Sequence, residues 1–471
     1  MMAVTGELLL AYYGDDFTGS TDALEFLSRA GAKTVLFIQP PTPEQLARYE
    51  GLQAIGVAGL ARAMAPDEME LELRPAFTAL RALGAAHVHY KVCSTFDSSP
   101  AIGSIGKAID IATTIFEAPF VPLLVAAPAL GRYCAFGNLF ARMGIGSSGI
   151  IYRIDRHPSM SRHPITPADE GDLRLHLARQ TKKRIGLMDN LQVVLPVAQA
   201  SRELESAIQG GAEVMLFDAL YEAHLETIGE LINAYATPEK PLFSVGSSGI
   251  EMALGKYWEH TGQLQPVRNW VEPGFAAPLL VVSGSCSPVT SGQISWALAN
   301  GFQEIALDTE AIARNTSDEW FRCAVADALT FLQEGRSVIV HTSRGMHDAR
   351  VVKTEEVFRL QGLDKASMQR QTARLYGAAL GRIVRAIVGE TELQRIVIAG
   401  GDTSSYAARE IGIEAVEMIA PVTPGAPLCK AYAPGSPADG LEVNFKGGQV
   451  GPENYFGIIS QGKSSLHTQT I

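Results

Sequence analysis

Short apolar segments alternate with longer segments of helical period along the first half of the chain. Runs rich in Val, Leu and Ile predict strands at Glu7–Tyr13, Lys33–Ile38, Leu52–Ala58, Ala86–Val92 and Val121–Ala127. Between these runs, apolar residues at helical spacing predict helices at Thr21–Ala30, Asp67–Leu83 and Ile102–Phe116. Apolar strands separated by helices are typical of a parallel sheet covered on both faces. The pattern predicts an α/β fold.

The alternation resumes in the second half, after a segment that interrupts it. Strands are predicted at Leu279–Ser283, Ser337–His341, Arg395–Ala399 and Leu441–Phe445. Helices are predicted at Pro288–Ala299, Asp318–Glu334 and Ala366–Val388. The interruption, Asn269–Pro278, holds two prolines and a glycine, as a linker does. We therefore predict two domains, 1–270 and 271–471, each a mainly parallel sheet flanked by helices.

Composition and charge exclude several classes of protein. Hydrophobic residues make up 46% and charged residues 19% of the chain, which is the balance of a globular protein. The net charge of −11, without a long Lys/Arg run, argues against a nucleic-acid partner. No run reaches the roughly 18 to 20 apolar residues of a membrane span, and the first residues do not resemble a signal peptide. Scattered cysteines indicate reduced thiols, so we expect a cytoplasmic protein.

The segment Gly14–Asp22 (GDDFTGSTD) follows the first strand and opens a helix. Ligands of open parallel sheets bind beyond the carboxyl ends of strands, which makes this loop a candidate site. The simpler interpretation is a turn whose Asp or Ser caps the helix. Asp15 and Asp16, with three hydroxyls, exceed what one cap needs. A carboxylate here could orient or deprotonate a substrate hydroxyl.

Two further segments bring charge to strand ends. Lys91, followed by Ser94 and Asp97, lies inside a strand pattern and is either a surface lysine or a group that faces an anion. The other segment carries Arg153, Arg156, His157, Arg162 and His163. It is either a solvated connector or a binding site for a carboxylate or phosphate. So many basic residues in an acidic chain favour the anion site.

Three strand ends are rich in glycine and small hydroxyl residues. They are Phe243–Gly249, Val281–Gln293 and Val397–Glu410. Glycine lets the backbone approach a phosphate, and amides at a helix start can donate to it. Tight turns with caps are the alternative for each loop alone. The recurrence of the pattern favours nucleotide phosphates.

Two matches to short motifs are discounted. Gly457–Ser464 (GIISQGKS) fits the phosphate-loop pattern, but only seven residues follow it, too few for the helix that such a loop opens. We interpret it as a frayed tail. Gly144–Gly149 (GIGSSG) fits the dinucleotide-binding pattern but precedes the β-like sequence IIYRI. We interpret it as a loop.

Six motifs, in this order, resemble those of the four-carbon acid-sugar kinases, which include the 3-oxo-tetronate and threonate kinases. They are GDDFTGSTD at Gly14–Asp22, YKVCSTFDSS at Tyr90–Ser99, RHPITP at Arg162–Pro167, SGSCS at Ser283–Ser287, GGDTS at Gly400–Ser404 and KGG at Lys446–Gly448. The likeness covers nearly the whole chain. It implies that domain 1–270 binds the acid sugar, that domain 271–471 binds ATP, and that the active site lies in the cleft between them.

The resemblance also implies roles for individual residues. Those on the acid-sugar side, besides the Asp15 and Asp16 loop and Lys91, are Asp22, Ser94, Asp97, Arg162 and His163. Those on the nucleotide side are Ser283, Ser285, Gly400, Gly401, Asp402, Thr403 and Gly448. Phosphoryl transfer needs positioning, Mg²⁺ and charge neutralisation more than covalent chemistry.

We assign catalysis to Asp16, Asp15 and Lys91. Asp16 would accept the substrate hydroxyl proton, while Asp15 and Asp22 support it or help to place the metal. Lys91 and Arg162 would hold the substrate carboxylate. Asp402 contacts either Mg²⁺ or a ribose hydroxyl, and the metal ligands stay open.

The expected activity is ATP-dependent phosphorylation of 3-oxo-tetronate or a related 3-oxo or branched sugar acid. A threonate or erythronate kinase and a non-catalytic sugar-acid binding protein are the alternatives. A lyase or dehydrogenase would need a Schiff-base lysine, a metal triad or a valid dinucleotide motif, and we find none. The sequence does not give the phosphorylated hydroxyl or the oligomeric state, although a homodimer is compatible with it.

Overall fold

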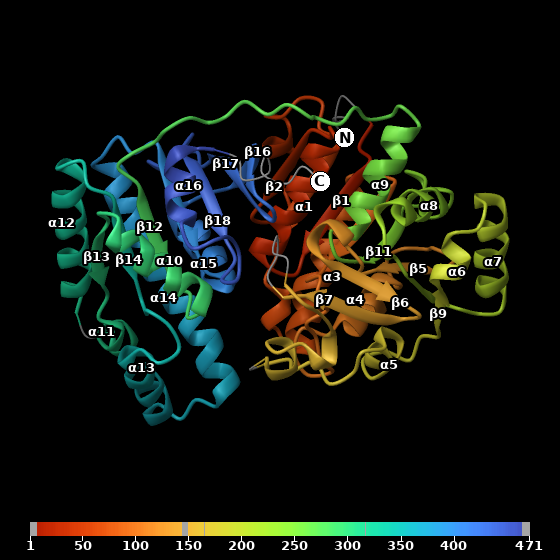
Figure 1. Cartoon of the computed structure of the whole chain (residues 1–471), viewed down its shortest axis with the longest axis horizontal. Coiled ribbons are helices and arrows are strands. Elements are labelled where there is room, and N and C mark those ends of the chain that lie inside the picture. Colours follow the sequence, from red (N-terminus) through yellow and green to blue (C-terminus); the bar gives the residue numbers. More distant parts are fainter. Residues whose placement is uncertain (1–6, 144–148, 164, 316, 464–471) are drawn as a thin grey trace. The chain divides into compact units, whose positions relative to one another are not determined.

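A computed structural model describes residues 7–143, 149–163, 165–315 and 317–463 (Figure 1). The chain divides into two compact units, Met1–Arg268 and Asn269–Ile471. Each unit is a mainly parallel sheet flanked by helices, which confirms the predicted two-domain α/β class. None of the described helices combines the length and hydropathy needed to cross a membrane.

The sheet of the first unit is parallel in every strand pair that the structure describes. Its strands, in spatial order, are β2 (Thr34–Phe37), β3 (Ala54–Ala58), β1 (Leu10–Gly14), β4 (His87–Lys91), β11 (Leu242–Gly246), β5 (Val121–Leu124), β10 (Val214–Phe217) and β9 (Ile185–Met188). The next two strands along the chain, β2 and β3, lie on one side of β1, and β4 lies on the other side. The switch point of the sheet therefore lies between β1 and β4, where open α/β sheets bind their ligands.

Helices cover the faces of this sheet, and a small antiparallel sheet is added to it. The helices are α1 (Phe17–Arg29), α2 (Pro43–Leu46), α3 (Pro66–Ala82), α4 (Ile105–Ala112), α5 (Leu173–Ala178), α6 (Asn190–Val193), α7 (Val197–Gln209), α8 (Glu222–Asn233) and α9 (Gly249–His260). The small sheet consists of β6 (Arg132–Ala135), β7 (Asn138–Arg142) and β8 (Ile151–Arg153). Phe136 and Gly137 both have positive φ in the two-residue turn between β6 and β7, as tight hairpins require.

The second unit combines parallel strands with an antiparallel hairpin. Its strands, in spatial order, are β13 (Gln303–Ala306), β14 (Val338–His341), β12 (Leu280–Ser283), β15 (Arg395–Ala399), β18 (Glu442–Lys446), β17 (Ala426–Tyr432) and β16 (Ala415–Thr423). Its helices are α10 (Pro288–Ala299), α11 (Thr309–Arg314), α12 (Glu319–Gln333), α13 (Ala349–Leu360), α14 (Lys365–Gly389), α15 (Gly401–Ile411) and α16 (Tyr455–Gln461). The switch point lies between β12 and β15.

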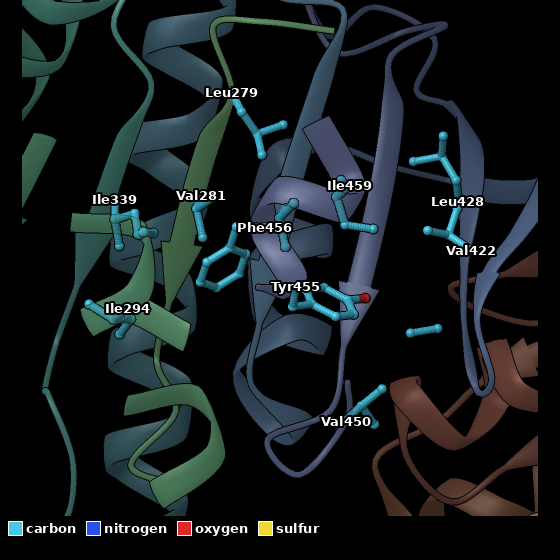
Figure 2. Close-up of a cluster of buried hydrophobic side chains, with 13 residues drawn as sticks. Leu279, Val281, Ile294, Ile339, Val422, Leu428, Val450, Tyr455, Phe456 and Ile459 are labelled. Carbon is cyan, nitrogen blue, oxygen red and sulfur yellow. The ribbon is translucent and has the colours of Figure 1, made fainter. Parts of the chain in front are cut away.

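A hydrophobic cluster joins the sheet of the second unit to its last helix (Figure 2). Tyr455, Phe456 and Ile459 of α16 are fully buried against residues such as Val281 and Leu428. The interpretation of Gly457–Ser464 as a frayed tail is therefore wrong for the part inside α16. The match is still not a phosphate loop, because its first glycine lies inside a helix and its lysine follows the helix end.

Two helices begin at residues other than those predicted, and each difference has a physical reason. Helix α1 begins at Phe17 instead of Thr21, because Asp16 accepts a hydrogen bond from the Gly19 amide and caps the helix there. Helix α4 begins only at Ile105, where Ser104 is the cap. Of the predicted loop Gly144–Gly149, all but the last residue lie outside the described residues.

Candidate active site

Three strand ends meet at the switch point of the first unit. In the sheet register, Gly14 of β1 lies opposite Lys91 of β4, and Lys91 lies opposite Gly246 of β11. A Cβ atom at Gly14 would overlap the hydroxyl of Ser20, which donates a 2.6 Å hydrogen bond to the Asp16 carbonyl. Glycine at this position therefore lets the loop fold back tightly over the strand end.

Asp15 and Asp16 are held together by Arg62, a residue that follows β3. Its Nη2 lies 2.8 Å from Asp15 Oδ1, and its Nη1 lies 2.7 Å from Asp16 Oδ2. Burial raises the pKa of Asp15 to about 6, although Arg62 opposes the shift. Asp16 also caps α1 through Oδ1, so both interpretations of this loop, cap and charged cradle, apply to the same side chain. The two carboxylates share one guanidinium.

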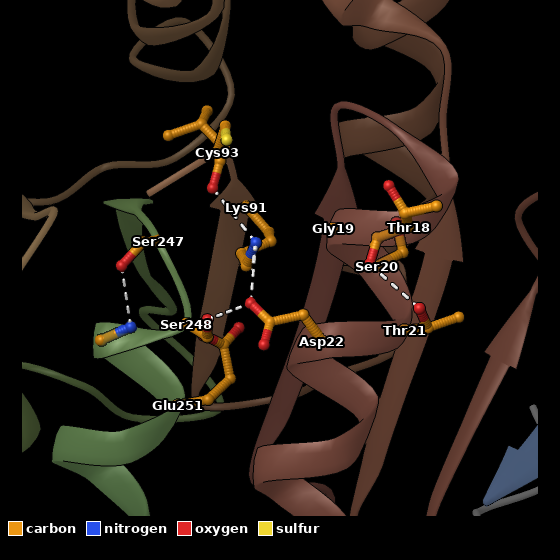
Figure 3. Close-up of polar contacts among 12 residues, drawn as sticks. Thr18, Gly19, Ser20, Thr21, Asp22, Lys91, Cys93, Ser247, Ser248 and Glu251 are labelled. Carbon is orange, nitrogen blue, oxygen red and sulfur yellow. Dashed lines mark hydrogen bonds and ion pairs between the residues drawn. The ribbon is translucent and has the colours of Figure 1, made fainter. Parts of the chain in front are cut away.

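Lys91 is not a surface lysine, since it is only 1% exposed. Its Nζ lies 3.5 Å from Asp22 Oδ2 and donates a 3.1 Å hydrogen bond to the Val92 carbonyl (Figure 3). Burial opposes the charge of Lys91, but Asp22, followed by Glu251, outweighs it and raises the pKa of the lysine. Lys91 is therefore an ammonium at the strand end, as an anion-binding group must be.

The start of α9 completes this group from the other side. Ser248 donates a short hydrogen bond to Asp22 Oδ2, and Glu251 is completely buried nearby (Figure 3). We expected Phe243–Gly249 to join the glycine-rich nucleotide loops of the second half. The structure places this segment in the first unit beside Asp22, and its contact with nucleotide phosphates stays a prediction.

Glu251 faces a buried histidine. His89 Nδ1 lies 3.0 Å from the Ser244 hydroxyl and 3.2 Å from the Ser244 carbonyl. Its Nε2 lies 3.6 Å from Glu251 Oε1. Burial lowers the pKa of His89 to about 3 and raises the pKa of Glu251 to about 8, although Lys91 opposes the latter shift. Near neutral pH the two side chains are an imidazole and a carboxylic acid.

The loop after β4 carries the other predicted residues of this strand. Ser94 is buried, and Asp97 Oδ1 is buried without a hydrogen-bond partner among the residues that the structure describes. Phe96 between them has φ of 59°, which is rare for a bulky residue and costs about 1–3 kcal/mol. Ser98 fixes the loop by accepting or donating at His176 Nε2, 2.9 Å away. A strained backbone that aims an unpaired carboxylate is typical of a binding site.

The basic segment from Arg153 to His163 offers fewer unbalanced positive charges than its composition indicated. Arg153 forms a two-pronged ion pair with Asp155 at 2.6 and 2.7 Å, so its charge is already balanced. Arg162 is exposed, and His163 Nδ1 accepts a 3.1 Å hydrogen bond from the Thr166 amide. Among the described residues, no hydrogen bond or ion pair joins Arg162 or His163 to Lys91. Their substrate contacts stay predictions.

The second unit brings its own three loops together. Ser283 of β12 lies opposite Ala399 of β15, and Ala399 lies opposite Lys446 of β18. The segments that follow these strands are SGSCS, GGDTS and KGG, which the sequence had placed far apart. Ser285 lies in the first of them, and a Cβ atom at Gly448 would lie 3.0 Å from its hydroxyl. These loops form one glycine-rich and hydroxyl-rich surface at the sheet edge.

Helix α15 opens toward this surface without a side-chain cap. Gly400 is its N-cap residue with φ of 139° and provides no side-chain cap. A Cβ atom at Gly401 would meet no described atom within 4 Å apart from its chain neighbours and its own helix backbone, so there is open space at the helix start. Asp402 and Thr403 lie in the first turn. Amides at an uncapped helix start, with room above them, fit a phosphate group.

No resident metal centre is apparent in the part of the chain that the structure describes, where no three His, Cys, Asp or Glu side chains cluster as ligands. Mg²⁺ that arrives with a nucleotide does not need such a cluster, because it binds through phosphates, waters and one or two carboxylates. Asp402 is the carboxylate in the first turn of α15. The residues therefore fit a metal carried by the nucleotide.

Comparison with known proteins matches both units. The family described as "Sugar-binding N-terminal domain" matches residues 10–254, and the one described as "Nucleotide-binding C-terminal domain" matches residues 280–456. The chain is thus a two-domain sugar-binding and nucleotide-binding α/β protein. It belongs to the four-carbon acid-sugar kinase family, as its motifs predicted.

Individual relatives align along nearly the whole chain. A 3-oxo-isoapionate kinase of Paraburkholderia graminis is 43% identical, covering 97% of this chain and 95% of its own. A 3-oxo-tetronate kinase of Cupriavidus necator is 30% identical, with 95% of each chain covered. The solved structure of a Salmonella typhimurium LT2 protein, 23% identical, has a TM-score of 0.74 and covers 96% of this chain and 98% of its own. That last likeness supports the fold.

Proposed function

We propose that this protein is an ATP-dependent kinase of a short 3-oxo sugar acid, with 3-oxo-isoapionate as the preferred substrate and 3-oxo-tetronate as the second. The observation that carries the proposal is the 43% identity over 97% of the chain with a 3-oxo-isoapionate kinase, against 30% with a 3-oxo-tetronate kinase. The cytoplasmic location that the sequence predicts is consistent with this activity, because ATP is available there.

The first unit supplies groups suited to the acceptor. We assign Lys91 to the substrate carboxylate or 3-oxo group, because it is a buried ammonium at the switch point. Asp16, with Asp15 beside it, would orient the substrate hydroxyl and accept its proton as the oxygen attacks phosphorus. Arg62 holds both carboxylates in place, and Asp97 offers a further acceptor for a sugar hydroxyl.

The second unit supplies groups suited to the donor. The amides at the start of α15 and the Ser285 and Gly448 loops would bind the phosphates of ATP. Mg²⁺ bound to ATP supplies neutralisation of phosphate charge, and Asp402 would contact the metal or a ribose hydroxyl. Transfer requires that the acceptor hydroxyl and the γ-phosphorus come within about 3–3.5 Å of each other during turnover.

An ADP-release assay tests the proposal. The purified protein with ATP and Mg²⁺ is given 3-oxo-isoapionate, 3-oxo-tetronate, threonate and erythronate in turn. We expect the highest kcat/KM with 3-oxo-isoapionate and at least about tenfold less with threonate and erythronate, which lack the oxo group. Preference for threonate or erythronate would replace the proposed substrate class, and no ADP release with any acid would remove the kinase assignment.

A further inference from the structure

Lys446 is a buried lysine to which the proposed reaction gives no role. It is the last residue of β18, and its exposed fraction is 0%. Lysine is among the residues that are almost never fully buried unless they are paired with an opposite charge. A lysine buried at the edge of a sheet, beside the glycine-rich loops, therefore needs an explanation.

Every hydrogen-bond partner of the Lys446 ammonium is neutral. Nζ lies 3.0 Å from Thr290 Oγ1, 2.8 Å from the Gly447 carbonyl and 3.4 Å from the Gly448 carbonyl. Helix α16 adds the ring of Tyr455, whose centroid is 5.6 Å away and whose hydroxyl donates to Asn444. In the described part of the chain, no carboxylate lies within ion-pair distance of Lys446.

A buried cation without a counter-charge is unfavourable. Desolvation of an unpaired ammonium costs several kcal/mol, and the group responds by losing its proton. Burial accordingly lowers the pKa of Lys446 to about 7. The described residues offer no negative charge to hold the ammonium form, so a bound anion is the group that could supply it.

The contacts of Lys446 also orient the loop that follows it. Because the carbonyls of Gly447 and Gly448 point toward Nζ, the planar trans peptides turn the next amides to the opposite side. Ser287 and Thr290 donate to the same Gly448 carbonyl, which strengthens this orientation. Gly400, at the start of α15, donates its amide to the Lys446 carbonyl at 2.9 Å. Lys446 thus lies directly behind the loops proposed to bind phosphates.

We propose that Lys446 is the counter-charge of the nucleotide site, a lysine that takes up a proton when a polyphosphate binds over the Gly447–Gly448 loop. The proton comes from solvent and is accepted by the lone pair of Nζ, so no other reactant is needed. Lys446 acts through the loop carbonyls and is a positioning residue. This inference rests on the proposed nucleotide role of the second unit.

Calorimetric titration with Mg²⁺-ADP at pH 8 tests the inference. The phosphates of ADP are ionised at this pH, so the ligand itself contributes little proton exchange. Repeating the titration in buffers of different ionisation enthalpy gives the number of protons taken up. We expect about half to one proton per nucleotide for the unchanged protein, since a lysine that titrates near neutrality is mostly neutral at pH 8.

Two variants assign the proton to this side chain. Lys446→Met should lose the uptake and bind ADP at least about tenfold more weakly, because a charged hydrogen-bond donor is removed. Lys446→Arg should keep the charge without uptake, because a guanidinium stays protonated at all relevant pH values. The exposed Lys463→Ala is the control and should take up as many protons as the unchanged protein.

The outcomes separate the inference from the proposed function. ADP binding without proton uptake by the unchanged protein would overturn the role of Lys446 and leave the nucleotide site intact. Uptake that persists in Lys446→Met would overturn it as well. If the unchanged protein bound no ADP, the nucleotide site and the inference would both fall. Should Lys446→Met not fold, as judged by circular dichroism, the buffer series and Lys446→Arg still decide.

Discussion

Asp16 has two tasks that one substitution can separate. Its Oδ1 caps α1, and its negative charge faces Arg62 and the proposed substrate hydroxyl. Asparagine caps helices as well as aspartate does but cannot take the proton. We expect Asp16→Asn to lower kcat by at least about 10²-fold while the free energy of unfolding changes by about 1 kcal/mol or less.

Steady-state kinetics and urea unfolding measure both quantities. Asp308→Asn, at another helix N-cap whose Oδ1 accepts from the Ala311 amide, is the matched control and should keep its kcat. Near-normal turnover of Asp16→Asn would take this carboxylate out of the chemistry.

Glu251 should make the free energy of unfolding fall as pH rises, which is the opposite of the usual effect of a carboxylate. Its pKa in the folded protein, about 8, is above the ordinary value of 4.5 because of burial. The folded state therefore holds a proton that the unfolded state releases, and stability falls as pH rises through this window. Glu251→Gln keeps the neutral shape and removes the titration, so its stability relative to the parent should rise by at least about 1 kcal/mol from pH 6 to pH 9.

Urea unfolding at several pH values measures this difference. Glu259→Gln, on an exposed position of the same helix, is the control and should show no such rise. A constant difference between Glu251→Gln and the parent at all pH values would mean that Glu251 is not the titrating group.

At the level of single residues, the sequence could predict groups that follow strands but not their partners. Asp15, Asp16 and Lys91 stand out because a strand pattern ends beside them. Arg62 is 47 residues from Asp15 in an ordinary-looking loop, and only the fold brings the two side chains together. Glu251 lies within a helical pattern where a charged residue is usually solvated, so nothing in its neighbours signals burial.

Among the elements, α15 and α16 offer a direct contrast between two glycine-rich segments. A Cβ atom at Gly401 would meet no described atom of a neighbouring segment within 4 Å, so Gly401→Val should fold and yet extend into the space proposed for phosphate. We expect this variant to lose binding of a non-hydrolysable ATP analogue. Lys463 follows α16 and is exposed, so Lys463→Ala should keep ATP affinity and kcat within about twofold.

Calorimetric titration compares the two variants. Retention of nucleotide by Gly401→Val with loss by Lys463→Ala would move the nucleotide site to the C-terminal motif. Thermal melting provides the folding check for Gly401→Val.

The elements themselves divide into those that apolar runs predict and those that they do not. Buried parallel strands such as β15 and amphipathic helices such as α12 appear within one or two residues of their predicted bounds. The hairpin β16–β17 was missed because Pro421 and Pro427 weaken any strand prediction. The strands β6 to β8 are too short to show a pattern. Helix α16 is stabilised by core packing that local sequence does not reveal.

For the whole molecule, the linker between the two units should be the first site of proteolysis. The segment from residue 269 to 277 has no helix or strand, and Val271 and Phe275 are 85% and 72% exposed. Exposed segments without regular structure are the preferred sites of nicking. Limited chymotrypsin treatment should therefore cut first after Trp270 and give two large fragments, because hydrogen bonds to Ser460 hold Ala276 and protect the bond after Phe275.

Mass spectrometry of the fragments locates the cut. Tyr221 and Phe136 are 67% and 53% exposed but lie next to a helix start and in a tight hairpin, so they serve as internal controls. Earlier cleavage at either of them would contradict the prediction.

The buried guanidinium of Arg395 has a practical consequence for anyone who edits the end of this chain. It donates to the Gly274 carbonyl at 3.1 Å, to the Ile459 carbonyl at 2.6 Å and to Glu442 at 2.7 Å. A chain shortened to end at Asn454 would lack the Ile459 carbonyl that accepts from Arg395. It would also lack the three buried core side chains of α16, which are those of Tyr455, Phe456 and Ile459. Such a product should accumulate poorly in an expression host, because quality-control proteases degrade chains that open often.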